Sequence, residues 1–313
     1  YLILILNLIT IRLMIYFKTM MNDLLIVGGF GSIGSKIINN LKDDFKIHVI
    51  DKKLNVDFNF CNYEICNLSD KKLNVEKFPD QLTVIYLIGN LTNSLTSENA
   101  LISIDDNISS LTNFLILFSK KIKHIIFVSS VSVYGVPEYN PTDEQHPINP
   151  HSFYGSQKAC AEIICRTLCN NFCIPLTIIR STQLFGLFSA EHTLPHLLMK
   201  NLKSGKPILL TGDPNSERDY LHVSDFCNFI TDVIKTPKEG IFNIGSGKGL
   251  KLIELFKIAF NAFGIPFKEN DIISKGNNLS YSQILDIKRA QRIYGFEPKY
   301  TMKEWFYDTI NIK

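Results

Sequence analysis

Short apolar runs alternate with longer amphipathic stretches along most of this 313-residue chain. The short runs have the length and composition of buried strands, and apolar residues recur with a helical period in the stretches between them. Because strands that alternate with helices are joined by crossover connections, we predict an α/β protein with a doubly wound parallel sheet covered on both faces. The predicted strands are residues 24–27, 46–50, 83–88, 124–129 and 176–180, and the predicted helices include 35–41, 99–119 and 153–171.

The regular alternation of strands and helices ends after residue 181. Short strand-like runs at 208–211, 220–222 and 241–244 are interleaved there with helices and loops. No repeat or low-complexity linker separates this part from the rest, so the two parts should pack as one body. We predict a main domain over residues 21–180 and a smaller mixed α/β C-terminal lobe over residues 181–313, interleaved with the first.

Residues 1–20 form an apolar stretch outside this pattern. Polar residues such as Arg12 and Lys18 interrupt it, and no run approaches the roughly 18 apolar residues of a membrane span. We expect this extension to lie outside the fold, which would begin at Met21, and to be an upstream translated stretch or a fragment boundary. An interfacial amphipathic anchor is the alternative, and only then would we expect a membrane contact.

Three glycines follow the first predicted strand at the spacing of a phosphate-binding turn. Gly28, Gly31 and Gly34 lie in GGFGSIG, between that strand and a helix. The first glycine permits the tight turn, the second lets the backbone approach a diphosphate, and the third lets helix and strand pack closely. The N-terminus of the helix adds partial positive charge. This pattern predicts a Rossmann-type dinucleotide-binding domain over residues 21–180.

The residues after the second strand bear on the choice of cofactor. Asp51 ends that strand, where a carboxylate accepts hydrogen bonds from the adenosine ribose and repels a 2′-phosphate, so NAD is favoured. Lys52 and Lys53 keep NADP open as the less favoured alternative, since either ammonium could neutralise a 2′-phosphate.

A serine, a tyrosine and a lysine have the spacing of a proton-transfer site. Tyr154 and Lys158 are one helical turn apart and should share a helix face. We expect the Lys158 ammonium to lower the pKa of the Tyr154 phenol, which is ordinarily near 10, and to hold the nicotinamide ribose. Ser130 follows the strand at 124–129, at the sheet edge where ligands of such folds bind, and could orient the substrate oxygen on which Tyr154 acts.

These motifs occur together with several others in an order that resembles one family. The chain resembles extended short-chain dehydrogenases/reductases of the NAD-dependent epimerase/dehydratase family, whose members act on nucleotide sugars. The resemblance runs from about residue 23 to 310. The remaining segments that carry it are CNLSD (66–70), VIYLIG (84–89), Asn107, VSSVSVYG (128–135), SFYGSQKACAE (152–162), RSTQLFG (180–186), GDPNSERDYLHVSD (212–225), FNIGSG (242–247) and DIKRAQRIYGFEP (286–298).

The resemblance implies a set of binding residues. It places Arg218 on a substrate phosphate, and we expect Ser130 and Gln183 beside the substrate as well. It also implies a homodimer through the helices at 99–119 and 153–171, and a role in surface polysaccharide precursor synthesis. The cofactor-binding residues implied by the motifs and the resemblance are Gly28, Phe30, Gly31, Ser32, Ile33, Gly34, Asp51, Lys52, Asn67, Leu68, Leu87, Ile88, Gly89, Asn107, Tyr154 and Lys158.

At three places the residues of this chain differ from the family pattern, and these differences affect the prediction of the substrate and the reaction. Sugar 4,6-dehydratases of the family carry an Asp-Glu pair where this chain has Val131 and Ser132, so elimination of water is disfavoured. The Phe-Asn common after the next strand is replaced by Thr182 and Gln183. The late arginine that grips the second phosphate has no clear counterpart around residues 275–282.

The net charge and the cysteines argue against a nucleic-acid partner and against a metal site. With 33 Lys and Arg against 30 Asp and Glu, the net charge is +3, too small to indicate a nucleic-acid partner. The 7 cysteines include no CxxC pair, which favours reduced thiols and a cytoplasmic protein. Cys165, Cys169 and Cys173 recur every four residues without a histidine, so we expect small core residues and no metal site.

The resulting hypothesis is a nucleotide-sugar 4-epimerase that works through a 4-keto intermediate with tightly held NAD. Tyr154 would take the proton of the 4-hydroxyl while hydride passes to NAD, and the turned keto-sugar would take the hydride back on its other face. A one-way nucleotide-sugar reductase or dehydrogenase with exchangeable NAD(P) needs the same residues and stays open. A noncatalytic dinucleotide-binding protein is the third alternative, and the intact set of Ser130, Tyr154 and Lys158 argues against it.

Overall fold

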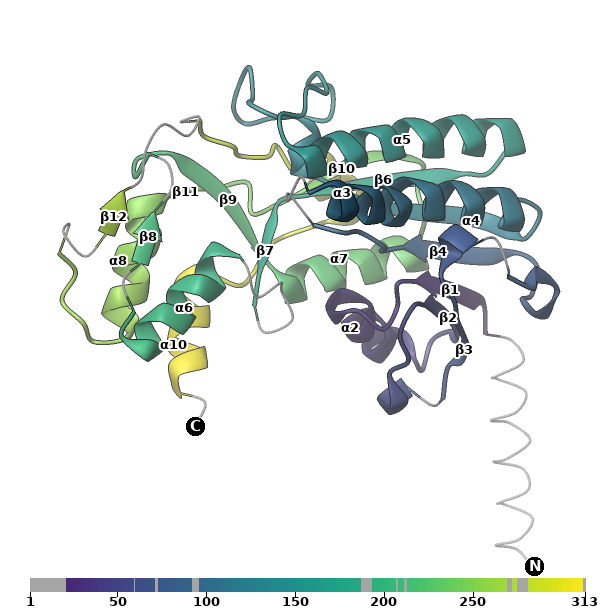
Figure 1. Ribbon diagram of the computed structural model, residues 1–313, viewed down its shortest axis with the longest axis horizontal. Helices are drawn as coiled ribbons and strands as arrows, with labels where there is room; N and C mark the ends of the chain where they lie inside the picture. The colour runs from purple at the N-terminus through teal and green to yellow at the C-terminus, as the bar shows by residue number, and fades with distance from the viewer. Residues whose placement is uncertain are drawn as a thin grey trace, which may run out of the picture.

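The computed structural model describes residues 21–58, 60–70, 73–91, 96–186, 193–206, 208–210, 213–268, 272–274 and 281–311. The N-terminal extension, residues 1–20, lies outside the described residues, as does most of the segment in which a second phosphate-binding arginine was sought. Figure 1 shows a large body built around one sheet and a smaller body beside it that holds the C-terminus.

Seven parallel strands form the main sheet, in the order β10-β6-β5-β4-β1-β2-β3. The order reverses between β1 and β4, and the crevice outside the carboxyl ends of strands at such a switch point is where these folds bind ligands. The predicted doubly wound α/β fold is therefore confirmed. The strands are β1 (Asp23–Val27), β2 (Lys46–Asp51), β3 (Asn62–Ile65), β4 (Leu82–Tyr86), β5 (Ile122–Ser130), β6 (Leu176–Ser181) and β10 (Gly240–Ile244).

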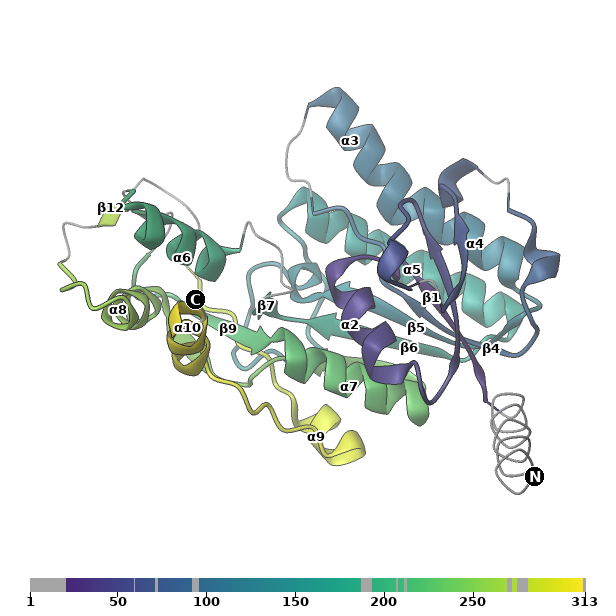
Figure 2. The same cartoon turned by 90° about the horizontal axis from the view of Figure 1, so that it is seen from below.

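Helices cover both faces of the sheet, and each face has its own apolar core (Figures 1 and 2). α2 (Ser32–Leu41) and α7 (Val223–Lys235) pack together on one face. The short α9 (Lys288–Tyr294) lies on the same face and contacts α7 and β10. α4 (Ser110–Phe118) and α5 (Phe153–Phe172) cover the other face. The strands between them are almost wholly buried, as their apolar sequences predict.

α4 continues a longer helix that begins with α3 (Ser97–Ile104) and passes through a π-helical segment, Asp105–Ser109. Within the described residues, Ser97–Phe118 is one helix long and apolar enough, by length and composition, to cross a membrane. Its C-terminal part buries Leu111, Phe114 and Phe118 completely against the sheet. These three apolar residues are therefore used in the core of the fold.

Two strands of the main sheet differ from the sequence-based expectation. The run at 241–244 was placed in the C-terminal lobe, but β10 pairs in parallel with β6 and extends the main sheet. The apolar residues of this run predict that it is buried. They do not predict which sheet it joins, because that depends on where α7 returns the chain. β3 was not predicted, because as an edge strand it leaves most of its residues exposed and has no apolar run.

The smaller body has two small sheets and three helices. β7 (Gln183–Phe185), β9 (Glu217–His222) and β11 (Gly249–Lys251) form one sheet, and β8 (Ile208–Leu210) pairs with β12 (Ile272–Ser274). α6 (Leu194–Ser204), α8 (Leu252–Ala262) and α10 (Met302–Asn311) enclose a third core that contains Phe185, Phe256, Trp305 and Phe306. β9 and β7 lead directly from this body toward the carboxyl edge of the main sheet (Figure 1).

Candidate active site

The turn between β1 and α2 requires glycine at specific positions. Gly28 has a φ of +80°, and its N–H donates to the Ile50 carbonyl oxygen at 2.8 Å, which ties the turn to β2. A Cβ at Gly34 would lie 2.4 Å from the Gly29 oxygen, so only glycine lets α2 pack on the turn. A Cβ at Gly31 would meet only the Gly28 oxygen, at 3.4 Å, so the N-terminus of α2 stays open. This cradle fits a diphosphate.

The other predicted residues of the turn occupy its rim. Phe30 stacks on Phe58 with ring centroids 6.0 Å apart, and Ile33 packs against the core beneath. Ser32 is exposed at the first turn of α2. The loop after β4 lies beside the turn, since a Cβ at Gly28 would come within 3.2 Å of the Ile88 nitrogen. Leu87 joins this loop to β1 through a 2.9 Å hydrogen bond from its N–H to the Val27 oxygen.

Asp51 faces the glycine turn from the end of β2. Its Oδ2 accepts a hydrogen bond from the Phe30 N–H at 2.9 Å, and its Oδ1 accepts one from the Lys53 N–H at 3.2 Å. The carboxylate is half-buried and keeps lone pairs for further donors. The geometry therefore suits the two ribose hydroxyls of adenosine.

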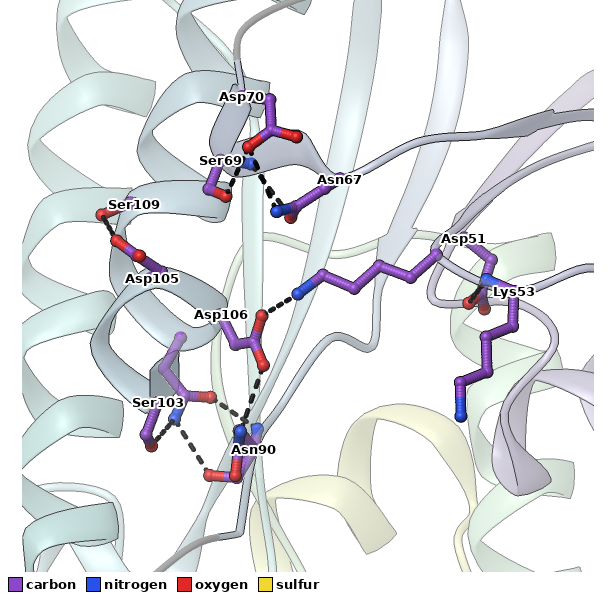
Figure 3. A network of polar contacts seen from close by, with 12 residues as sticks. Asp51, Lys53, Asn67, Ser69, Asp70, Asn90, Ser103, Asp105, Asp106 and Ser109 are labelled. Carbon is purple, nitrogen blue, oxygen red and sulfur yellow. Dashed lines mark hydrogen bonds and ion pairs between the residues drawn. The ribbon is translucent and has the colours of Figure 1, made fainter. Parts of the chain in front are cut away.

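Lys52 contacts a distant carboxylate rather than the turn. Its Nζ forms an ion pair with Asp106 in the π-helical segment, and the same carboxylate accepts a 3.1 Å hydrogen bond from Asn90 Nδ2. Figure 3 shows Asp106 with a contact on each side, while the Lys53 side chain points away from it. Sequence reasoning identified Lys52 but not its partner.

Asn67 and Leu68 follow β3 at the same edge of the sheet. Asn67 Nδ2 donates to Asp70 Oδ1 at 3.2 Å, which shapes the short 3₁₀ turn η2 (Leu68–Asp70). The Leu68 carbonyl accepts a 3.1 Å hydrogen bond from Asn113 Nδ2 on α4. Both residues thus flank the predicted adenine position, with their local polar groups already engaged.

Asn107 is the centre of a buried polar network in the π-helical segment. Its Oδ1 accepts from the Asn90 N–H at 2.8 Å, and its Nδ2 donates to the Asn90 oxygen at 3.0 Å and to Gln157 Oε1 at 2.6 Å. Ser103 Oγ donates to the same Gln157 oxygen at 2.8 Å. Sequence reasoning missed Gln157 and Ser103. The signal available was the position of Gln157 directly before Lys158, within the motif around Tyr154.

Ser130, Tyr154 and Lys158 converge at the carboxyl end of β5. Tyr154 and Lys158 lie on the first turns of α5, and Ser130 caps the 3₁₀ turn η5 (Val131–Val133). A hydrogen bond joins Ser130 to Tyr154. Lys158 Nζ donates to the Val128 oxygen at 3.0 Å and to the Ile88 oxygen at 3.4 Å. A Cβ at Gly89 would lie 3.3 Å from that nitrogen, so this glycine leaves room for the ammonium.

Burial dominates the ionisation of this pair. Burial raises the pKa of Tyr154 to about 12, although the hydrogen bond from Ser130 acts to lower it. Burial lowers the pKa of Lys158 to about 8, although the Glu162 carboxylate acts to raise it. The expected lowering of the Tyr154 pKa by Lys158 is therefore not found in this structure. The reason is that the ammonium is directed to two backbone carbonyls, while Lys158 is buried and Tyr154 is partly buried.

An ion pair behind Lys158 was not anticipated. Glu162, one turn further along α5, pairs with Arg180 on β6 at 2.7 Å, and both side chains are almost completely buried. Ser129 Oγ donates to Glu162 at 2.5 Å, and Arg180 Nη1 donates to the Tyr134 hydroxyl at 3.0 Å. The spacing of Tyr154, Lys158 and Glu162 at every fourth position was visible in the sequence, but not that Arg180 would face the last of them.

Arg218 and Gln183, which are expected on the substrate side, lie on β9 and β7 in the three-stranded sheet of the smaller body. Arg218 on β9 donates to the Tyr281 carbonyl and stacks on the Tyr281 ring, with 4.5 Å between guanidinium carbon and centroid. The Tyr281 hydroxyl lies 3.3 Å from His151 Nε2, just before α5. Gln183 is exposed at the start of β7. Tyr281 and His151 were not predicted as site residues.

In the described part of the chain, no group of three His, Cys, Asp or Glu side chains is placed to hold a metal ion. Cys165 and Cys169 are buried on α5, whereas Cys173 ends the helix and is exposed.

Comparison with known proteins gives consistent similarities. A family model, described as the NAD dependent epimerase/dehydratase family, matches residues 24–245. A Methanocaldococcus jannaschii protein, provisionally named a UDP-glucose 4-epimerase, is 31% identical over 304 residues, which cover 92% of this chain and 97% of that protein. An Escherichia coli O157:H7 protein, N-acetyl-alpha-D-glucosaminyl-diphospho-ditrans,octacis-undecaprenol 4-epimerase, is 29% identical over 224 residues, 70% of this chain and 66% of its own length.

The fold resembles solved structures over nearly the whole chain. The crystal structure of the Thermotoga maritima UDP-glucose 4-epimerase with UDP-glucose superposes with a TM-score of 0.82 at 21% identity. The similarity covers 93% of this chain and 100% of that one.

Proposed function

Because this chain belongs to the NAD dependent epimerase/dehydratase family, we propose that it is a nucleotide-sugar 4-epimerase that keeps its NAD bound through the reaction. The family description names NAD as the cofactor, and the open glycine turn with Asp51 at the end of β2 fits that cofactor. The residues around the turn would hold the diphosphate and the adenosine ribose.

The observation that carries this proposal is the arrangement of Tyr154. Its phenol is hydrogen-bonded to Ser130 and lies one helical turn from Lys158, at the same sheet edge as the glycine turn. No carboxylate directly follows Ser130, because the next two residues are Val131 and Ser132. Val131 is buried, and the Ser132 N–H donates to Ser130 Oγ. A site with one tyrosine and no acid–base carboxylate pair suits reversible oxidation of a hydroxyl better than elimination of water.

The roles of the residues follow from this geometry. Tyr154 takes the proton of the sugar 4-hydroxyl and returns it after the keto-sugar has turned over. Ser130 donates to the reacting oxygen, and Lys158 holds the nicotinamide ribose. When bound, NAD would supply the hydride acceptor and the positive charge of its nicotinamide ring. Since burial raises the pKa of Tyr154 to about 12 and Lys158 does not lower it, the phenol depends on the positive charge of the bound cofactor to act as a base at neutral pH.

The substrate proposal rests on the names of the relatives and on Arg218. UDP-glucose is the substrate named for the first relative and a lipid-linked diphosphosugar for the second, so both have a sugar attached to a diphosphate. Arg218 lies in the part of the chain that we assign to substrate binding, residues 181–313, and its guanidinium, which stacks on the Tyr281 ring, suits a diphosphate. We propose a nucleoside-diphosphate sugar as the substrate and the precursor supply for surface polysaccharides as the role.

We also propose that the protein acts in the cytoplasm as a homodimer. The helices expected at the interface carry large exposed apolar side chains, including Leu101 on α3, Ile116 on α4 and Ile163 on α5, which are 65%, 51% and 52% exposed. Such residues on neighbouring helices are typical of a surface that a second copy covers.

The test combines cofactor analysis with a turnover assay. The purified chain is denatured and any released dinucleotide is identified by chromatography. The native protein is then incubated with UDP-glucose, without added cofactor, and formation of the 4-epimer is followed. Stoichiometric NAD and turnover without addition support the epimerase. An empty site with reversible NADH or NADPH binding and net reduction of a keto-sugar would instead favour the reductase or dehydrogenase.

A further inference from the structure

The Lys52–Asp106 ion pair connects the two sides of the crevice above β1. β1 lies between β2 and β4 in the sheet, and the glycine turn begins at its carboxyl end. Lys52 directly follows β2, whereas Asp106 is bonded to Asn90 in the loop after β4. These contacts therefore join the two strands that flank β1, at the edge where the cofactor is proposed to lie.

The pair is placed to be stronger than an ordinary surface contact. The Lys52 side chain is 40% exposed, but that of Asp106 is only 16% exposed. A carboxylate that is mostly removed from water interacts more strongly with a cation than one in bulk solvent, and salt screens the interaction less. Asn90 occupies the other carboxylate oxygen, so Asp106 is held in the orientation that meets Lys52.

Hydrogen bonds connect Asp106 to the part of the site that holds Lys158. Asn90 is paired through its backbone N–H and oxygen with the Asn107 side chain, and Asn107 binds Gln157, the residue before Lys158. Figure 3 shows this chain of contacts from Asp106 through Asn90 toward Ser103. Asp106 is thus fixed by a buried network, and Lys52 is the part that can swing away.

We propose that Lys52 and Asp106 form a latch over the adenosine half of the bound dinucleotide, and that Asp106 also makes the site selective for NAD by holding Lys52. The proposal rests on the dinucleotide binding of the proposed function. Release of the cofactor requires the ion pair to open. While it is closed, the Lys52 ammonium is paired with Asp106 and does not serve a 2′-phosphate.

The first test measures cofactor release from the full chain. The protein is loaded with NADH, mixed rapidly with excess NAD, and the loss of NADH fluorescence is followed. We expect Lys52→Gln and Asp106→Asn each to speed release about threefold, the scale of a partly exposed ion pair. The double variant should release NADH no faster than either single one, because both remove the same contact. Lys53→Gln is the matched control, since Lys53 is a neighbouring exposed lysine that points away from Asp106, and its rate should equal that of the wild type.

The second test measures selectivity as the ratio of the NADPH and NADH dissociation constants. Asp106→Asn frees the Lys52 charge and should lower this ratio about five- to tenfold, whereas Lys52→Gln should not lower it. Unchanged or slower NADH release in both single variants, or additive effects in the double variant, would overturn the latch. An equal ratio in Asp106→Asn and wild type would overturn the selectivity role. If the wild type bound no dinucleotide at all, the proposed function itself would be wrong.

Discussion

Glu162 and Arg180 form a 2.7 Å ion pair that is almost completely enclosed between α5 and β6, one helical turn behind Lys158. Glu162 also accepts a hydrogen bond from Ser129, and its charge raises the pKa of Lys158 against the effect of burial. The pair therefore joins α5, which carries Tyr154 and Lys158, to β5 and β6, and it helps to keep the nearby ammonium charged.

Removing one partner of this pair should be strongly destabilising. Glu162→Gln leaves the Arg180 guanidinium buried without its counter-charge, so we expect a loss of about 3–5 kcal/mol in the free energy of unfolding, measured by urea denaturation. The control is Glu254→Gln, which breaks the exposed pair with Lys257 and should cost less than about 0.5 kcal/mol. Equal losses in the two variants would show that the enclosure of Glu162 has no energetic effect.

The phenol of Tyr154 should be needed for turnover but not for cofactor binding. Tyr154→Phe keeps the ring and removes the group that transfers the proton, so we expect a fall in kcat of about 10²–10⁴-fold, the usual contribution of a positioned acid–base group. NADH binding, followed by fluorescence titration, should change by less than about twofold. Turnover at the wild-type rate would exclude Tyr154 as the acid–base group.

Lys158 should make stability depend on pH in an identifiable window. Its pKa in the folded chain is about 8, below the ordinary lysine value of 10.5, so between these two values the unfolded chain holds a proton that the folded chain has lost. Stability then rises with pH across that window. In protein stripped of dinucleotide, the free energy of unfolding of the wild type relative to Lys158→Met should rise by about 1 kcal/mol from pH 7 to 9.

Urea denaturation at a series of pH values measures this difference. Lys257→Met, at an exposed position on α8, is the control and should show no comparable slope. A flat difference for Lys158→Met would mean that the ammonium is better solvated than its burial implies. The raised pKa of Tyr154 acts in the opposite direction, since its phenol binds a proton more tightly when folded, but only above pH 10.

Two glycines of the turn should respond differently to alanine. At Gly34 a Cβ would lie 2.4 Å from the Gly29 oxygen, so Gly34→Ala should destabilise the fold by about 1–3 kcal/mol and impair NADH binding. At Gly31 the nearest atom is 3.4 Å away, so Gly31→Ala should fold normally yet bind NADH at least about tenfold more weakly, because the methyl group meets the diphosphate. Unaltered NADH binding by Gly31→Ala would contradict the assigned place of the diphosphate.

The proposed dimer should depend on the exposed apolar positions of α4 and α5. Ile116→Glu combined with Ile163→Glu places two charges on that surface, and we expect the sedimentation coefficient to change from that of a dimer to that of a monomer. Ile293→Glu, at an exposed apolar position on α9 on the other face of the sheet, is the control and should leave the assembly unchanged. A wild-type chain that sediments as a monomer would refute the dimer.

Local patterns in the sequence determined the class of fold and the positions of the main candidate residues. Apolar runs of strand length alternating with helical stretches were enough to predict the doubly wound sheet, because burial on both faces imposes that pattern directly on each segment. The glycine spacing and the interval between Tyr154 and Lys158 are equally local, since a tight turn and one turn of helix each lie within a few residues.

Only the tertiary structure decided which distant groups meet and how far each is removed from water. The partner of Lys52 is 54 positions away and that of Glu162 is 18, so neither contact follows from spacing. β10 joins the main sheet because α7 carries the chain back to β6, which no property of its own residues records. The pKa of Tyr154 rises rather than falls because burial and the direction of the Lys158 ammonium, both products of packing, outweigh the proximity of the two residues along the helix.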